Sequence, residues 1–113
     1  MTAPDQPVAL ITGAGSADGI GFAIANALGQ AGMATLICST SGRIFDRAEE
    51  LRQSGISAHG FIADLTIEAD VHRLCADAQS QYGRIDVLVN NAGMAQLGSP
   101  EPFAEIANMK LNN

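Results

Sequence analysis

The sequence has few basic residues and few cysteines, and both shortages exclude classes of function. Its 113 residues carry 12 acidic but only 6 basic side chains, which gives a formal net charge of -6. The basic residues are scattered singly, whereas binding to nucleic acid or to an anionic membrane surface requires a basic cluster. We therefore expect no nucleic-acid partner and no membrane partner, and we interpret the acidity as a contribution to solubility.

The two cysteines, Cys38 and Cys75, are far apart and form no Cys-x-x-Cys motif. Because each lies in an apolar run, both are predicted to be small buried side chains in a reducing compartment, not a disulfide or metal ligands. The polar tail, residues 1–7, lacks the basic-then-apolar order of a signal peptide. No apolar run has the length that a bilayer requires. These absences favour a cytoplasmic location.

What the chain does contain is a regular alternation of apolar, β-prone runs with helical segments. Continuous apolar runs predict buried strands, and the amphipathic segments between them predict helices. The predicted strands are residues 8–11, 34–38, 58–63 and 85–89, and the predicted helices cover residues 22–28, 44–51, 67–78 and 103–111. This order predicts one domain, residues 1–113, built on an open parallel Rossmann-type α/β sheet with flanking helices.

The third helix has the clearest pattern. Thr66 is in position to cap its start, since a threonine hydroxyl can accept a hydrogen bond from the first turn. Ile67, Val71, Leu74 and Ala78 then fall on one stripe, which is predicted to face the sheet.

Four glycines, Gly13, Gly15, Gly19 and Gly21, lie between the first predicted strand and the first predicted helix. Bare backbone at this junction lets a pyrophosphate approach the amino end of the helix, whose N–H groups and dipole attract anions. The alternative is a plain turn, because turns also collect glycine. The spacing departs from G-x-G-x-x-G because Asp18 stands where the third glycine belongs. Its carboxylate is expected to weaken phosphate binding unless it points outward.

These residues resemble a known family. The run TGAGS at residues 12–16, followed by GIG at 19–21, is similar to the T-G-x-x-x-G-x-G signature of the short-chain dehydrogenase/reductase family, with two extra residues. The run NNAG at residues 90–93 matches the N-N-A-G motif of that family. Asp64 and Leu65 stand where the family places an aspartate against the adenine. The three motifs occur in the family's order, each after its own predicted strand.

The resemblance extends over residues 8–93 and implies a set of cofactor-binding residues. It places Gly13, Ser16, Gly19, Ile20 and Gly21 around the pyrophosphate and its ribose, Asp64 and Leu65 at the adenine, and Asn90, Ala92 and Gly93 along the adenosine side of the cleft. Asn91 is expected to tie the central strands together instead. For the N-N-A-G run the alternative is a well-capped turn without a ligand.

The end of the second predicted strand bears on the choice of cofactor. An NAD enzyme places Asp or Glu there to bind the ribose 2′-hydroxyl, but this chain has STS at residues 39–41, followed by Arg43. Thr40 and Arg43 are predicted to bind a 2′-phosphate, because a guanidinium grips phosphate through charge-assisted hydrogen bonds. NADP is therefore preferred over NAD, although Asp18 counts against it. The alternative makes Ser41 a helix cap and Arg43 a solvated residue.

The residues that family members use for hydride transfer are not found in the sequence. The family employs a serine and a Tyr-x-x-x-Lys pair, but Tyr82, the only tyrosine, is followed four residues later by Asp86. Lys110 is the only lysine, and the residue four positions before it is Ile106, not tyrosine. His59 and His72 are isolated and are expected to be structural or solvent-facing. We assign no catalytic residue and no metal ligand.

The resemblance implies NAD(P)-dependent oxidation of an alcohol or reduction of a carbonyl, with this chain supplying only the cofactor-binding part. The sheet is then expected to be truncated at its carboxyl-terminal side, which leaves the outer edge of the strand at 85–89 exposed. The alternative is a non-catalytic nucleotide-binding or interaction protein that pairs through this edge with a second copy or another chain. A methyltransferase or flavin domain is disfavoured by the N-N-A-G run. The substrate is not predicted.

Overall fold

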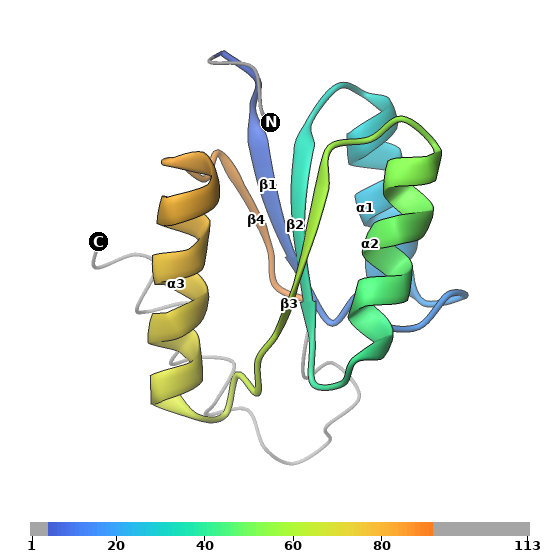
Figure 1. The fold of residues 1–113 in the computed structure, drawn as a ribbon. Coiled ribbons are helices and arrows are strands. Elements are labelled where there is room, and N and C mark those ends of the chain that lie inside the picture. Colours follow the sequence, from blue (N-terminus) through green and yellow to red (C-terminus); the bar gives the residue numbers. More distant parts are fainter. Residues whose placement is uncertain (1–4, 92–113) are drawn as a thin grey trace.

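The computed structural model describes residues 5–91 and shows a parallel four-stranded sheet with helices on both faces (Figure 1). Strands and helices alternate along the chain. They are β1 (Val8–Thr12), α1 (Ile20–Gln30), β2 (Ala34–Ser39), α2 (Arg43–Gln53), β3 (Ala58–Ile62), α3 (Glu68–Tyr82) and β4 (Val87–Val89). The strand order is β3-β2-β1-β4, with every neighbouring pair parallel. The predicted Rossmann-type α/β sheet is confirmed.

The sheet is covered on both faces by helices, which explains why the central strands β1 and β2 are mostly apolar and buried. In β1, Ala9 and Ile11 pack into the cluster that contains residues of α1 and α2. Leu10, between them, packs into a second cluster with Leu74 and Ala78 of α3. Successive side chains of a strand point to opposite faces, so every position of β1 is buried. Figure 1 shows α1 and α2 on one side of the sheet and α3 on the other.

The strand order places a change of direction beside β1. The chain runs outward from β1 to β2 and β3, and then returns to pair β4 with the other side of β1. All four strands are parallel, so the loops that follow them meet at one edge of the sheet. In open α/β sheets ligands bind in the crevice at the carboxyl ends of the strands, where the strand order reverses. Here this point lies between β1 and β4.

Two details of the predicted third helix are wrong. The helix begins at Glu68, and its N-cap is Ile67, without a side-chain cap hydrogen bond. Thr66 does not cap it, because its hydroxyl donates to Oδ1 of Asp64 at 2.6 Å. Ile67 is 48% exposed because it precedes the helix, whereas Val71 and the later members of the stripe are buried as predicted.

The fourth predicted strand and the last predicted helix compare differently with the structure. The fourth strand is three residues long, Val87–Val89, and so shorter than the predicted range 85–89. The helix predicted over 103–111 lies outside the described residues. Within residues 5–91, no helix is long and apolar enough to cross a membrane.

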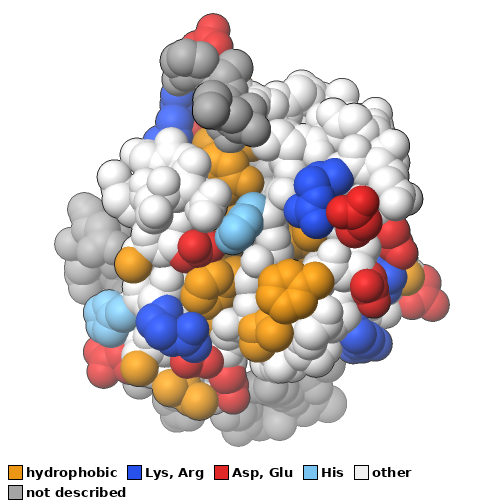
Figure 2. All heavy atoms as spheres, in the orientation of Figure 1, with side chains coloured by type: hydrophobic (Ala, Val, Ile, Leu, Met, Phe, Trp, Pro, Cys, Tyr) orange, Lys and Arg blue, Asp and Glu red, His pale blue; other side chains and the backbone are white. Residues whose placement is uncertain are grey.

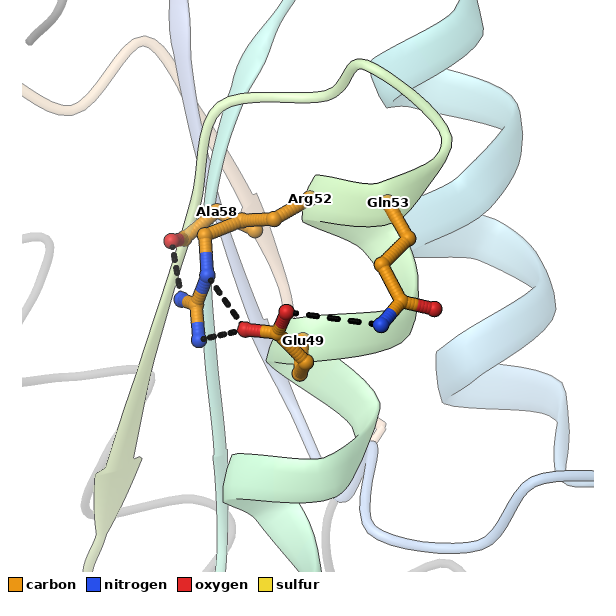
Figure 3. A network of polar contacts seen from close by, with 4 residues as sticks. All are labelled: Glu49, Arg52, Gln53 and Ala58. Atoms are coloured by element: carbon orange, nitrogen blue, oxygen red, sulfur yellow. Dashed lines mark hydrogen bonds and ion pairs between the residues drawn. The ribbon is translucent and has the colours of Figure 1, made fainter.

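Polar contacts attach α2 and α3 to the edge strand β3 from the two sides of the sheet. Arg52 of α2 reaches across to β3, where its Nη1 donates to the carbonyl of Ala58 at 2.9 Å. Glu49 holds the guanidinium through two hydrogen bonds, and Gln53 donates to the same carboxylate (Figure 3). On the other side, Nε2 of His59 lies 2.9 Å from Oδ2 of Asp77 in α3. His59 is thus a structural residue, as expected.

Apolar side chains remain exposed on this face. Figure 2 shows them gathered over β3 between α2 and α3, with charged side chains on both sides. Phe45 is 50% and Ile62 is 40% exposed. The expected exposure of His72 in α3 is also confirmed. Its side chain faces solvent, and its Nε2 lies 3.7 Å from Oε2 of Glu68.

Asp86 joins the beginning of β4 to the beginning of β1. Its Oδ2 accepts a hydrogen bond from the backbone N–H of Val8 at 2.8 Å, and its own N–H donates to the Val8 carbonyl at 2.8 Å. Arg84 donates to both carboxylate oxygens. The guanidinium first, and then the Val8 N–H, lower the pKa of Asp86 below its usual 3.8. The carboxylate therefore stabilises the attachment of a very short strand.

We expect Asp86→Asn to lower the thermal unfolding midpoint at pH 7. A carboxylate whose pKa is lower in the folded state stabilises the fold above its unfolded pKa, and loses this effect as the pH falls through its folded pKa. The difference in midpoint between wild type and variant should therefore narrow below pH 3.8. Asp46→Asn, an equal charge change at an exposed residue of α2, is the control. Equal midpoints of wild type and Asp86→Asn at pH 7 would contradict this role.

Candidate functional site

The loop between β1 and α1 is folded tightly against its neighbours. Gly13 has φ +68°, a conformation that favours glycine. A Cβ on Gly21 would stand 2.6 Å from the carbonyl oxygen of Gly13, and a Cβ on Gly15 would stand 2.8 Å from Oγ of Ser39. The N–H of Ala14 donates to the Cys38 carbonyl at 3.0 Å, which fixes the loop to the end of β2. Glycine is thus needed for close packing at Gly15 in the loop and at Gly21 in the first turn of α1.

The amino end of α1 is open to an anion. Its N-cap is Gly19, no side chain caps it, and its first turn contains no acidic residue. The first N–H groups of a helix have no partner within the helix, and the helix dipole places positive potential on them. Ile20, the first helical residue, is 66% exposed. The residues present therefore fit a pyrophosphate, which would accept hydrogen bonds from these N–H groups.

Asn91 ties the end of β4 to the same loop. Its Nδ2 donates to the Gly13 carbonyl at 3.1 Å, and its backbone N–H donates to Oγ1 of Thr12 at 2.9 Å. Thr12 in turn donates to the Val89 carbonyl at 3.3 Å. This network joins the carboxyl ends of β1 and β4. It agrees with the role that the family resemblance implied for Asn91.

The residues after β2 lie next to the glycine loop. Ser39 is half-buried under Gly15, and its hydroxyl donates to the Ser41 carbonyl at 3.1 Å. Thr40 and Arg43 are exposed, and Nε of Arg43 lies 3.5 Å from Oγ of Ser41. The structure thus places Arg43 at the surface beside Ser41, and its role at a 2′-phosphate stays a prediction.

The alternative role of Ser41 as a helix cap is wrong. The N-cap of α2 is Gly42, and it forms no side-chain cap hydrogen bond. Ser41 supports the first turn through its backbone, since its carbonyl accepts from the Ile44 N–H at 3.3 Å.

The predicted adenine residues follow β3 at the same edge. Asp64 is half-buried, and its Oδ1 accepts from both the backbone N–H and the hydroxyl of Thr66. Its backbone N–H donates to Oδ2 of Asp70 at 2.8 Å. Leu65 packs at the border of the cluster under α3. These contacts fix the direction of the Asp64 carboxylate, and its role at the adenine stays a prediction.

The structure therefore brings the residues that directly follow each of the four strands to one end of the sheet, but it does not describe every predicted residue. Asn90 is half-buried at the end of β4. Ala92 and Gly93 lie outside the described residues. Sequence reasoning missed the contribution of Ser39 beneath Gly15 and of Thr12 beneath Asn91. The positions of these hydroxyls at strand ends are the only signal for them in the sequence. Within residues 5–91 there is no group of three potential metal ligands.

Cys38 lies beneath the glycine loop and is buried. Burial raises the pKa of its thiol to about 12, although the nearby Gly13 N–H lowers it slightly. We expect the folded chain at pH 8 to leave Cys38 unmodified by iodoacetamide, because the thiolate is the reactive form. Mass spectrometry after denaturation should show both cysteines modified. Rapid modification of Cys38 in the folded chain would contradict this packing.

Comparisons with known proteins agree with this geometry. The sequence model of the short chain dehydrogenase family matches residues 7–113. The assigned ketoacyl reductase 1 of the granaticin polyketide synthase of Streptomyces violaceoruber is 40% identical over 101 residues, which are 88% of this chain and 36% of that protein.

Two solved structures resemble the fold closely. A variant of actinorhodin polyketide ketoreductase with NADPH has a TM-score of 0.77 and 35% identity, covering 94% of this chain and 42% of that one. A metagenomic short-chain oxidoreductase in complex with NADP has a TM-score of 0.74 and 31% identity, covering 88% and 45%. The chain thus spans less than half the length of these relatives.

The strand order, the glycine loop and the open helix end define an α/β protein of the Rossmann class. Together with the match over residues 7–113, they show that the chain belongs to the short-chain dehydrogenase/reductase family.

Proposed function

We propose that residues 5–91 bind a nicotinamide dinucleotide at the crevice between β1 and β4, with NADP(H) preferred. The observation that supports this most is the uncapped amino end of α1, which adjoins a loop where glycines allow close approach. Gly13, Ser16 and the run Gly19-Ile20-Gly21 would bind the pyrophosphate and its ribose.

The adenosine end of the cofactor would lie along the loops that follow β2, β3 and β4. Asp64 would accept a hydrogen bond from the adenine amine, and the Leu65 backbone would contact the ring. Asn90, with Ala92 and Gly93, would line the adenosine side of the crevice. The arrangement is supported by the meeting of these loops at one edge of a parallel sheet.

The preference for NADP(H) depends on the end of β2. Thr40 and Arg43 are exposed there, and neither Asp nor Glu occupies residues 39–43 to bind a ribose 2′-hydroxyl. Two structural neighbours of the chain hold NADPH and NADP. Arg43 would bind the 2′-phosphate through charge-assisted hydrogen bonds, with the Thr40 hydroxyl as a second partner.

As a family assignment, the proposed reaction is oxidation of an alcohol or reduction of a carbonyl, in which the bound nicotinamide accepts or supplies a hydride. The 113 residues contribute the cofactor site and contain no Tyr-x-x-x-Lys pair. The chain is therefore expected to bind NADPH without turning it over. An absorbance assay with a panel of ketones tests this, and steady oxidation of NADPH by the pure chain would refute it.

Calorimetric titration tests the cofactor site itself. We expect one NADPH per chain, weaker binding of NADH, and no heat of binding with S-adenosylmethionine or a flavin. Equal binding of all four compounds, or binding of the flavin alone, would reject the assignment.

A second candidate function uses the outer edge of β4. Among residues 5–91, β4 pairs with β1 alone, and its three apolar side chains are only half-buried. An edge of this kind can pair with a second copy or with another chain. Light scattering after size exclusion tests self-association, and a clean monomer would count against it. Separately, we propose a reducing, cytoplasmic location, because Cys38 and Cys75 each lie in an apolar run and form no Cys-x-x-Cys motif.

A further inference from the structure

The loop that precedes α1 carries a carboxylate held close to the helix end. The Gly19 N–H donates to the Ser16 carbonyl at 3.1 Å, which makes a tight turn over residues 16–19. The Ser16 hydroxyl donates to Oδ1 of Asp18 at 2.9 Å across this turn. The Asp18 side chain is therefore oriented by a contact within the loop.

This contact places the negative charge near the proposed phosphate site. Ser16 lies against the N-cap of α1, since a Cβ on Gly19 would stand 3.2 Å from Cβ and 3.7 Å from Oγ of Ser16. The carboxylate of Asp18 is one hydrogen bond away from that same hydroxyl. It does not cap the helix, because α1 has no side-chain cap hydrogen bond.

No neighbouring charge in the sequence offsets Asp18. Residues 1–42 contain no lysine or arginine, so the loop and α1 carry no basic side chain. The hydrogen bond from Ser16 lowers the pKa of Asp18 below its usual 3.8, and the group is ionised at neutral pH. Its charge interacts favourably with the positive end of the helix dipole while no ligand is bound.

From these contacts, and given the proposed function, we propose that Asp18 limits the affinity of the dinucleotide site. Its negative charge cancels part of the positive potential at the amino end of α1, and it repels the pyrophosphate that would bind there. Ser16 contributes to this effect, because its hydroxyl donates to the Asp18 carboxylate. It must break that hydrogen bond before it can donate to a phosphate oxygen.

The test is Asp18→Asn, which removes the charge and keeps an oxygen that can accept from Ser16. Binding is followed by the fluorescence of NADPH titrated with the chain. At low ionic strength we expect the variant to bind about threefold to tenfold more tightly, because Coulomb interactions over this range are only partly screened. In about 0.5 M salt the two dissociation constants should differ by less than about twofold.

Asp5→Asn is the matched control. It removes an equal charge from an exposed residue that precedes β1. This residue lies at the amino ends of the strands, away from the glycine loop, so its replacement should leave the dissociation constant unchanged. The thermal midpoint of unliganded Asp18→Asn should fall slightly while its affinity rises, because the helix loses a favourable charge. If Asp18 had only a structural role, its replacement would lower both the thermal midpoint and the affinity for NADPH.

The outcomes separate this inference from the proposed function. Saturable binding by wild type, with the same or weaker binding by Asp18→Asn, overturns the inference alone. No saturable fluorescence change with either protein overturns the proposed function, and the inference with it. Tighter binding by Asp18→Asn that persists in high salt also overturns the electrostatic inference.

Discussion

Replacing Gly21 with alanine is expected to abolish NADPH binding and to lower the thermal midpoint by roughly 10 °C. The added Cβ would stand 2.6 Å from the Gly13 carbonyl oxygen and 2.8 Å from Nδ2 of Asn91. The first contact is with backbone, so the loop itself must move. That movement would separate Asn91 from Gly13 and disturb both the hydrogen bonds that join β1 to β4 and the glycine loop. Differential scanning calorimetry and NADPH titration measure the two effects.

Gly42→Ala is the control for this substitution. Gly42 is the N-cap of α2, has φ -65°, and has nothing within 4 Å of the position that a Cβ would take. Its replacement should change stability by less than about 0.5 kcal/mol, as surface substitutions usually do. An equal loss of stability in Gly21→Ala and Gly42→Ala would contradict the close packing of the glycine loop.

Replacing Arg43 with alanine is expected to weaken NADPH binding by roughly 10- to 100-fold. A hydrogen bond to a charged group contributes about 1.5–3 kcal/mol, and each 1.4 kcal/mol corresponds to about a tenfold change in affinity. Because NADH has no 2′-phosphate, its dissociation constant should change by less than about twofold. Parallel titrations with the two cofactors measure this difference.

The control for Arg43 is Arg52→Ala, which removes the same charge from the other end of α2. Arg52 binds Glu49 and the Ala58 carbonyl, so its loss should affect stability and not the ratio of NADPH to NADH affinity. If Arg43→Ala weakened both cofactors equally, Arg43 would not be the residue that selects the 2′-phosphate.

The sequence predicts the elements of the fold well because β1 and β2 are buried on both faces, and α2 and α3 each bury one apolar stripe. The run at residues 8–11 is apolar throughout because Ala9 and Leu10 face different helices, and both faces are covered. Local patterns fail where a residue has a choice of partner. The sequence predicts that Thr66 caps the third helix, but its hydroxyl donates a hydrogen bond to the Asp64 carboxylate two residues earlier instead.

The candidate site could be predicted only in part. The glycines and the N-N-A-G run are local in sequence, and their motifs indicate a nucleotide loop. The contacts that hold this loop join residues about 25 to 80 positions apart, such as Ser39 beneath Gly15 and Asn91 beside Gly13. No local pattern predicts which hydroxyl or amide will lie there. The orientation of Asp18 likewise depends on a turn that only the structure shows.

Amide chemical shifts measured with and without NADPH would show residue by residue whether a dinucleotide binds at the amino end of α1. We expect the largest shift changes at Gly13 and at Gly19, Ile20 and Gly21, with smaller changes at Thr40, Arg43 and Asp64. Amides on the opposite edge of the sheet, such as that of Asp86, should not shift. Unchanged signals from residues 13–21 at saturating NADPH would mean that no dinucleotide binds at this helix end.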